Sequence, residues 1–166
     1  MINRNLDSDS MKSRNLYAIA GITGKIGGVL ARTLLAANQP VRAVVRDADK
    51  GAVWAAQGCE LALAEMHDEA ALTAAFEGAE AAFVLAPPNF DPEPGFPEAR
   101  AIGTATRNAL VHSNTSKVVY LSTIGAQATE ENLLTQHTIS EEIFRTLPIP
   151  VTFFRPAWFM EWRTVN

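Results

Sequence analysis

The chain has 166 residues, of which 48% are hydrophobic and 19% charged, enough for one domain with an apolar core. Its 14 Lys and Arg against 18 Asp and Glu give a net charge of -4, which argues against nucleic acid as a partner. The single cysteine, Cys59, excludes an internal disulfide and a multi-cysteine metal site, so no metal site is predicted.

Neither a membrane span nor a secretory signal is evident in the sequence. No apolar run approaches the roughly 20 residues of a membrane helix, and the polar segment 1–15 lacks the apolar stretch of a signal peptide. We therefore expect a cytoplasmic protein with no membrane partner. Residues 1–15 are predicted to be a disordered lead-in and residues 16–166 the folded domain.

Short apolar runs alternate with segments of helical periodicity. Strands are predicted at residues 16–20, 41–45, 61–64, 81–86, 117–122 and 151–154. Helices are predicted at 25–37, 49–57, from an N-cap at Asp68 to Gly78, and at 98–113 and 135–147, with an irregular proline-rich loop at 87–97. Apolar strands separated by helices predict a doubly wound parallel α/β sheet, with strand order 3-2-1-4-5-6.

A glycine motif, Gly-x-x-Gly-x-x-Gly, lies between the first strand and the first helix. Gly21 permits a tight turn, Gly24 lets a phosphate approach the backbone, and Gly27 lets the helix pack closely. The N–H groups of the helix that begins near Lys25 then face an anion. The motif predicts a Rossmann-type dinucleotide site, with a plain tight turn as the alternative. The site comprises Gly21, Ile22, Thr23, Gly24, Lys25, Ile26 and Gly27.

Arg46 follows the second strand, where a site that prefers NAD usually carries an acid. A guanidinium matches a phosphate bidentately. We therefore predict NADP(H) as the preferred cofactor, with Arg46 on its 2′-phosphate. Asp47 leaves NAD(H) open, and a solvated Arg46 paired with Asp47 or Asp49 is the alternative.

Four segments together resemble the NmrA-like branch of the atypical short-chain dehydrogenases and reductases. They are residues 21–27, 41–46, 118–125 and 154–161, and they cover nearly the whole chain after the lead-in. The resemblance implies a nicotinamide dinucleotide bound in a Rossmann domain. It implies either NADPH-dependent reduction of a quinone-, azo- or carbonyl-type acceptor, or a non-enzymatic redox sensor that acts through protein contacts.

The resemblance also implies site residues at the ends of the later strands. These are Glu65 and Met66 beside the adenine, Ala86 and Pro87 beside the ribose and nicotinamide, and Ser122 and Thr123 near the nicotinamide. Each has a plainer alternative, as a strand-end charge, a loop residue or a hydroxyl that caps a loop.

The chain departs from the family pattern in length. Family members usually run to nearly twice this length, and this chain ends just past the segment 154–161. Most of the C-terminal substrate-binding part is therefore expected to be missing. The apolar segment from Trp158 to Trp162 would then lack its covering, which predicts association between copies of the chain.

The catalytic Tyr-x-x-x-Lys of ordinary short-chain dehydrogenases is also absent, because Tyr17 and Tyr120 both fall in predicted strands. His137 stands at the equivalent place, four residues before Glu141. Its pKa near neutrality makes it a candidate proton donor, and Ser122 and Thr123 are the other catalytic candidates. The alternative is a partly exposed histidine beside a surface glutamate. Whether the chain is an enzyme or a remnant stays open here, as does its acceptor.

Overall fold

The computed structural model describes residues 15–157. Within this range one parallel sheet has the order β3-β2-β1-β4-β5-β6, which confirms the predicted fold class and strand order. The strands are β1 (Leu16–Ala20), β2 (Val41–Val45), β3 (Glu60–Leu63), β4 (Ala79–Val84), β5 (Lys117–Leu121) and β6 (Val151–Phe154). Because they are parallel, their carboxyl ends meet at one edge of the sheet.

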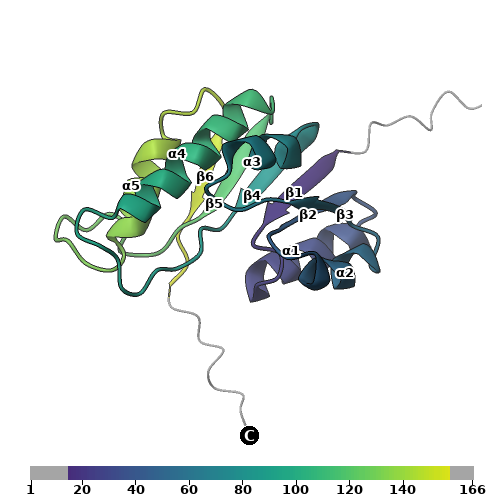
Figure 1. Ribbon diagram of the computed structural model, residues 1–166, viewed down its shortest axis with the longest axis horizontal. Coiled ribbons are helices and arrows are strands. Elements are labelled where there is room, and N and C mark those ends of the chain that lie inside the picture. Colours follow the sequence, from purple (N-terminus) through teal and green to yellow (C-terminus); the bar gives the residue numbers. More distant parts are fainter. Residues whose placement is uncertain (1–14, 158–166) are drawn as a thin grey trace, which may run out of the picture.

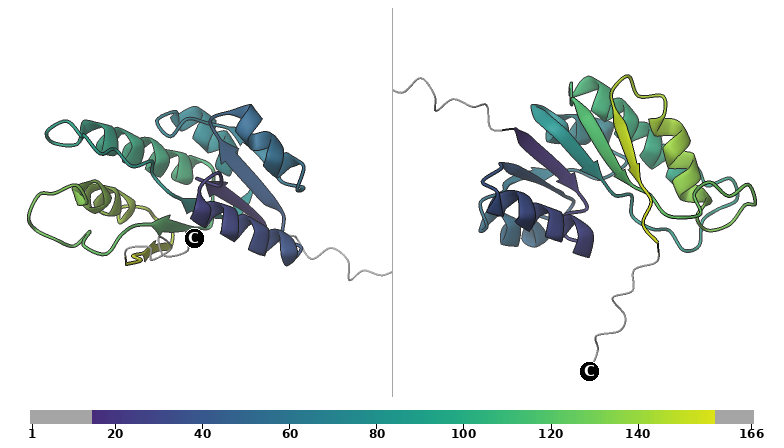
Figure 2. Two further views of the ribbon diagram at one scale, coloured as in Figure 1. Left: turned by 90° about the horizontal axis from the view of Figure 1, so that it is seen from below. Right: turned by 180° about the vertical axis from the view of Figure 1, so that it is seen from behind.

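Helices cover both faces of the sheet, as Figures 1 and 2 show. One face carries α1 (Lys25–Ala36) and α2 (Ala48–Ala55), and the other carries α3 (Glu69–Phe76), α4 (Pro97–His112) and α5 (Thr135–Phe144). None of the helices in residues 15–157 has the length and apolar character needed to cross a membrane.

The core is divided by the sheet into two apolar clusters. The cluster beneath α3, α4 and α5 contains Phe76, Tyr120 and Phe144, and the cluster beneath α1 and α2 contains Ile19 and Trp54. Burial on both faces explains why the strands read as continuous apolar runs.

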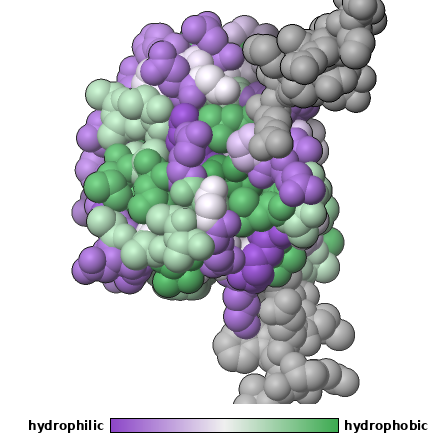
Figure 3. Space-filling view, turned by 90° about the vertical axis from the view of Figure 1, so that its right-hand side faces the viewer, coloured by the Kyte–Doolittle hydropathy of each residue, from purple (hydrophilic) through white to green (hydrophobic). Residues whose placement is uncertain are grey.

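The two edge strands, β3 and β6, are the exceptions to this burial, and β3 lies with α2 on one side of the molecule. Figure 3 views the molecule from this side and shows apolar side chains across the middle of the face. Leu61 and Leu63 of β3 are 39% and 58% exposed, and Val53 of α2 is 62% exposed. The strands are therefore least buried at the edges of the sheet.

Several boundaries differ from the prediction by a few residues. The fourth strand is 79–84 rather than 81–86, because Gly78, with φ of +72°, closes the turn after α3 and the chain enters β4 at once. The last helix ends at Phe144, and residues 145–147 form hydrogen-bonded turns instead. The other shifts are in β3, β5, α1, α2, α3 and α4. The predicted lead-in, apart from Asn15, and the apolar segment 158–162 lie outside the described residues.

Glu141 of α5 is 2% exposed, so the alternative of a partly exposed histidine beside a surface glutamate is wrong for Glu141. Ser122 Oγ and Arg155 Nε donate to its Oε1 at 2.6 and 2.7 Å. Arg145 donates to Oε2 at 3.1 Å, and Arg155 also pairs with that oxygen. Because Ser122 follows β5 and Arg155 follows β6, this carboxylate ties the ends of both strands to α5.

Burial acts to raise the pKa of Glu141, but the hydrogen bonds from Arg155, Ser122 and Arg145 outweigh it, and the pKa lies below its ordinary value. The ionised carboxylate therefore stabilises the folded state above the ordinary Glu pKa of about 4.3. This contribution is lost as pH falls through the lower pKa of the folded state.

We expect Glu141→Gln to lower the free energy of unfolding at neutral pH by about 1–3 kcal/mol, because it weakens charge-assisted hydrogen bonds to a buried group. Urea unfolding at several pH values measures this, and the difference from the wild type should shrink as pH falls below about 4.3. Glu142→Gln is the control, since the Glu142 side chain is exposed and forms no hydrogen bond with other described residues. A difference that grows in acid would contradict the assignment.

Candidate functional site

The turn from β1 into α1 closes on a backbone contact that only glycine allows. Gly21 has φ of +92°, and the Gly24 N–H donates to the Gly21 carbonyl at 3.1 Å. A Cβ on Gly27 would lie 2.3 Å from the same carbonyl oxygen. The first turn of α1 is therefore seated directly on the end of β1.

The N-terminus of α1 has no side-chain cap, unlike those of α2 and α3. Asp47 accepts from the N–H groups of Asp49 and Lys50 at the start of α2, and Asp68 accepts from Ala71 in α3. At α1 the N-cap is Gly24, with no capping hydrogen bond and no acidic residue in the first turn. Its N–H groups and the positive end of its dipole therefore suit an anion.

A cleft of about 450 Å³ runs from this turn along the carboxyl ends of the neighbouring strands. Its lining includes Gly21, Thr23, Gly24, Arg46, Asp47, Lys50, Glu65, Met66, Ala86 and Pro87. Residues from the ends of β1, β2, β3 and β4 thus face one elongated space, which suits an extended ligand.

Arg46 and Lys50 supply positive charge to this cleft. Both side chains are exposed, and neither forms an ion pair with another described residue. Asp47, the alternative partner for Arg46, instead caps α2, with Oδ1 accepting from Asp49 at 2.9 Å. Sequence reasoning missed Lys50, although its place in the first turn after Arg46 was an available signal.

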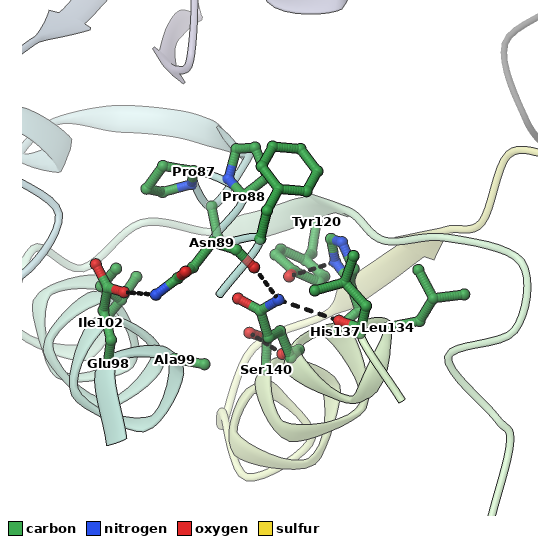
Figure 4. A pocket seen from close by; sticks show the side chains of 14 residues that line it. Pro87, Pro88, Asn89, Glu98, Ala99, Ile102, Tyr120, Leu134, His137 and Ser140 are labelled. Atoms are coloured by element: carbon green, nitrogen blue, oxygen red, sulfur yellow. Dashed lines mark hydrogen bonds between the residues drawn. The ribbon is translucent and has the colours of Figure 1, made fainter. Parts of the chain in front are cut away.

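A second pocket of about 180 Å³ adjoins the cleft and shares Pro87, Pro88 and other residues with it. Its walls come from α4 and α5, with the loop after β4 above them (Figure 4). Most of the lining is apolar, including Phe90, Leu133 and Leu134. The two spaces are therefore neighbours across the Pro87–Pro88 segment.

Gln136 of α5 fixes the loop that forms this pocket. Its Nε2 donates to the Asn89 carbonyl at 2.7 Å and to the Leu133 carbonyl at 3.1 Å. The Asn89 side chain also hydrogen-bonds the Glu98 carboxylate at the start of α4. The proline-rich loop is thereby connected to both helices, a connection that the sequence did not reveal.

Tyr120 and His137 are paired in the pocket. The Tyr120 hydroxyl lies 3.0 Å from Nδ1 of His137. Burial raises the pKa of Tyr120 to about 12, although a hydrogen bond with Ser140 acts in the opposite direction. Burial also lowers the pKa of His137, against the opposing effect of Glu141, so this imidazole is neutral at pH 7.

The structure brings together only part of the predicted site. The predicted residues that line the cleft are Gly21, Thr23, Gly24, Arg46, Glu65, Met66, Ala86 and Pro87, and His137 lines the second pocket. Ile22, Lys25, Ile26 and Gly27 do not line the cleft, and the Ile22 side chain is fully buried in the core. Lys25, Ile26 and Gly27 form the first turn of α1 beside it.

Ser122 and Thr123 line neither space. Ser122 is 5% exposed and donates to Glu141, and Thr123 donates to the Ile124 carbonyl at 3.2 Å. Their catalytic roles stay predictions. Among residues 15–157 no group of three or more His, Cys, Asp or Glu side chains is placed to hold a metal ion.

A protein family described as NAD(P)H-binding matches residues 21–166. The chain belongs to this family. The prediction of a nicotinamide dinucleotide site in a Rossmann domain is therefore confirmed at the level of the family, and the cleft beside the glycine turn is where the described residues suit such a ligand.

Two named relatives are a quinone oxidoreductase and an azoreductase. Quinone oxidoreductase 2 of Escherichia coli strain K12 is 30% identical over 149 residues, which are 88% of this chain and 50% of that protein. NAD(P)H azoreductase of Xenophilus azovorans is 36% identical over 72 residues, which are 43% of this chain and 25% of that protein. The chain thus spans about half the length of the first relative and less of the second.

Solved structures show the same fold. The Escherichia coli NADPH-dependent quinone oxidoreductase, complexed with NADPH, has a TM-score of 0.74 at 26% identity, over 87% of this chain and 50% of that chain. Triphenylmethane reductase of Citrobacter sp. has a TM-score of 0.75 at 24% identity, over 89% of this chain and 50% of that chain. The second likeness concerns the fold alone.

We expect Gly27→Ala to lower the free energy of unfolding by about 1–3 kcal/mol, because the added methyl meets the Gly21 carbonyl. Gly28→Ala is the matched control, because its Cβ would lie 3.3 Å from its nearest neighbours. Both variants gain the same helix propensity, about 1 kcal/mol. Urea unfolding compares them, and equal stabilities would show that the close contact is not a constraint.

Proposed function

We propose that this chain binds NADPH along the cleft and that, in the whole protein, a quinone-like or other carbonyl acceptor held in the adjoining pocket is reduced. One observation carries the proposal. A single cleft joins the uncapped N-terminus of α1 to the unpaired guanidinium of Arg46 and borders the pocket of Tyr120 and His137.

The residues of the cleft fit the parts of the dinucleotide. The turn at Gly21 and Gly24, with the first N–H groups of α1, would hold the pyrophosphate. Arg46, with Lys50 near it, would hold the 2′-phosphate, since a guanidinium binds phosphate bidentately. The adenine side is assigned to Glu65 and Met66, and the ribose and nicotinamide side to Ala86 and Pro87.

Two observations favour NADPH over NADH. The Asp47 carboxylate, which left NAD(H) open, is engaged as the cap of α2. The quinone oxidoreductase of similar fold is described in complex with NADPH, and the triphenylmethane reductase in complex with NADP(H). The positive charge of Arg46 and Lys50 in the cleft suits the additional phosphate.

When bound, NADPH supplies a hydride, which together with one proton converts a quinone to a hydroquinone and leaves NADP⁺. The protein's part is to hold the acceptor and to donate a hydrogen bond to its oxygen. His137 is the polar residue assigned to this task, because it lies in the pocket next to Pro87 and Pro88. The apolar walls of the pocket suit a flat, neutral acceptor.

We expect Arg46→Ala to weaken NADPH binding about 10- to 100-fold, the loss of one or two charge-assisted hydrogen bonds. NADH affinity should be nearly unchanged, because NADH lacks the 2′-phosphate. Calorimetric titration of the chain measures both affinities. Arg32→Ala, which removes an exposed arginine of α1 outside the cleft, is the control. An equal loss for NADPH and NADH would remove Arg46 from the phosphate site.

Turnover provides the second test. With duroquinone as acceptor, we expect NADPH absorbance to fall only when the quinone is present. His137→Gln should lower kcat at least about tenfold, because it removes the assigned donor. His112→Gln is the control, because His112 ends α4 and pairs with Glu69 away from the pocket. NADPH binding without turnover would favour the redox sensor, which the missing Tyr-x-x-x-Lys also suggests.

A further inference from the structure

We propose that Tyr120 is a positioning residue that holds the ring proton of His137 on Nε2. The pocket then presents a neutral N–H donor, and it selects acceptors that offer a carbonyl or quinone oxygen. The identity of this acceptor rests on the proposed function, whereas the placement of the proton rests on contacts within the protein.

Tyr120 is held rigidly enough to orient a partner. It lies in β5, its side chain is 0% exposed, and its ring contacts Phe144 edge-on with centroids 5.0 Å apart. Phe153 of β6 makes a second edge contact at 6.4 Å. With the ring fixed on both sides, the hydroxyl is directed at the first turn of α5, where His137 lies (Figure 4).

Either Tyr120 or His137 can be the donor in the hydrogen bond between them. The charge states of the two side chains limit which of them donates. The phenol keeps its proton, because burial raises the pKa of Tyr120 to about 12. The imidazole is neutral, because burial lowers the pKa of His137. A neutral imidazole has one N–H and one bare nitrogen, so either Nδ1 accepts from Tyr120 or it donates to Tyr120.

Ser140 decides between these polarities. Its single hydroxyl proton can go to the Gln136 carbonyl, 2.9 Å away, or to the Tyr120 oxygen. If Ser140 donates to Tyr120, the Tyr120 proton is left for Nδ1. If Ser140 donates to Gln136, two arrangements remain: Tyr120 donates to the serine oxygen and accepts from Nδ1–H, or Tyr120 donates to a bare Nδ1. The second is preferred, because an imidazole nitrogen is a more basic acceptor than a serine oxygen, and it places the Tyr120 proton on the bond to Nδ1.

The remaining ring proton therefore lies on Nε2, which has no hydrogen-bond partner among the described residues. Two side-chain amides line the same pocket. Gln136 donates to two carbonyl groups, and one N–H of the Asn89 amide donates to Glu98. His137 Nε2–H is thus a ring donor with no partner among the described residues, and an oxygen with free lone pairs is the group that satisfies it.

The test is the tautomer of His137, read from the ¹⁵N shifts and couplings of its ring by NMR. The chain has 3 histidines, and His137→Gln identifies the signals. We expect Nε2–H alone in the wild type and a mixture of tautomers in Tyr120→Phe, which keeps the aromatic contacts. Tyr17→Phe, on β1, is the control and should leave the signals unchanged. An Nδ1–H wild type, or an unaltered tautomer in Tyr120→Phe, overturns the proposal.

A kinetic cycle with duroquinone asks whether Tyr120 acts through His137. Tyr120→Phe should lower kcat/KM about fivefold, the size of one neutral hydrogen bond. In the His137→Gln background, Tyr120→Phe should cause no further loss of kcat/KM. Losses that multiply in the double variant would overturn the proposal. The tautomer measurement needs neither nucleotide nor turnover. Failure to bind NADPH would therefore reject the proposed function and leave the placement of the proton to be decided by NMR.

Discussion

No space exists for a methyl group between the Gly27 Cα and the Gly21 carbonyl, where a Cβ would come within 2.3 Å of the oxygen. This contact sets the first turn of α1 on the end of β1, and the orientation of the cleft follows from it. The parallel pairing of β1 with β2 and β4 brings Arg46 and Ala86 to the same edge of the sheet. One steric constraint and the sheet thus align three parts of the cleft: the N–H groups at the start of α1, the Arg46 side chain and Ala86.

The helix α5, which forms one wall of the second pocket, is positioned by hydrogen bonds to the buried Glu141 carboxylate rather than by close backbone packing. Removing the Glu141 carboxylate from water is costly, and three donor side chains offset that cost. Two of those donors follow β5 and β6, so the position of α5 is fixed relative to the sheet. His137 lies one helical turn before Glu141, where this anchoring sets its distance from Tyr120. The buried ion cluster is thereby connected to the geometry of the pocket without forming part of its lining.

Local patterns were sufficient for the fold and for the glycine turn, because apolar runs, helical periodicity and glycine spacing each report on adjacent residues. The pocket depends on pairs that are far apart in the sequence: Tyr120 and His137 are 17 positions apart, and Asn89 and Gln136 are 47 positions apart. Such pairs follow from how a helix lies across a strand, which periodicity does not reveal. A surface position for Glu141 was a reasonable alternative from the sequence, because ionisable helix residues are rarely buried unless paired, and two of its partners, Ser122 and Arg155, lie in other segments.

The missing Tyr-x-x-x-Lys has a physical counterpart in this pocket. Among the described residues the pocket is lined by no lysine, and Tyr120 is so deeply buried that it serves poorly as an acid. Its hydroxyl nevertheless lies 3.0 Å from Nδ1 of His137, and in the proposed tautomer it donates a hydrogen bond to that nitrogen. A neutral N–H directed at an oxygen stabilises negative charge that develops there, without a full positive charge being buried among Phe90, Leu133 and Leu134. The apolar walls and the neutral donor therefore favour the same ligand, an uncharged acceptor whose oxygen becomes negative only during reduction.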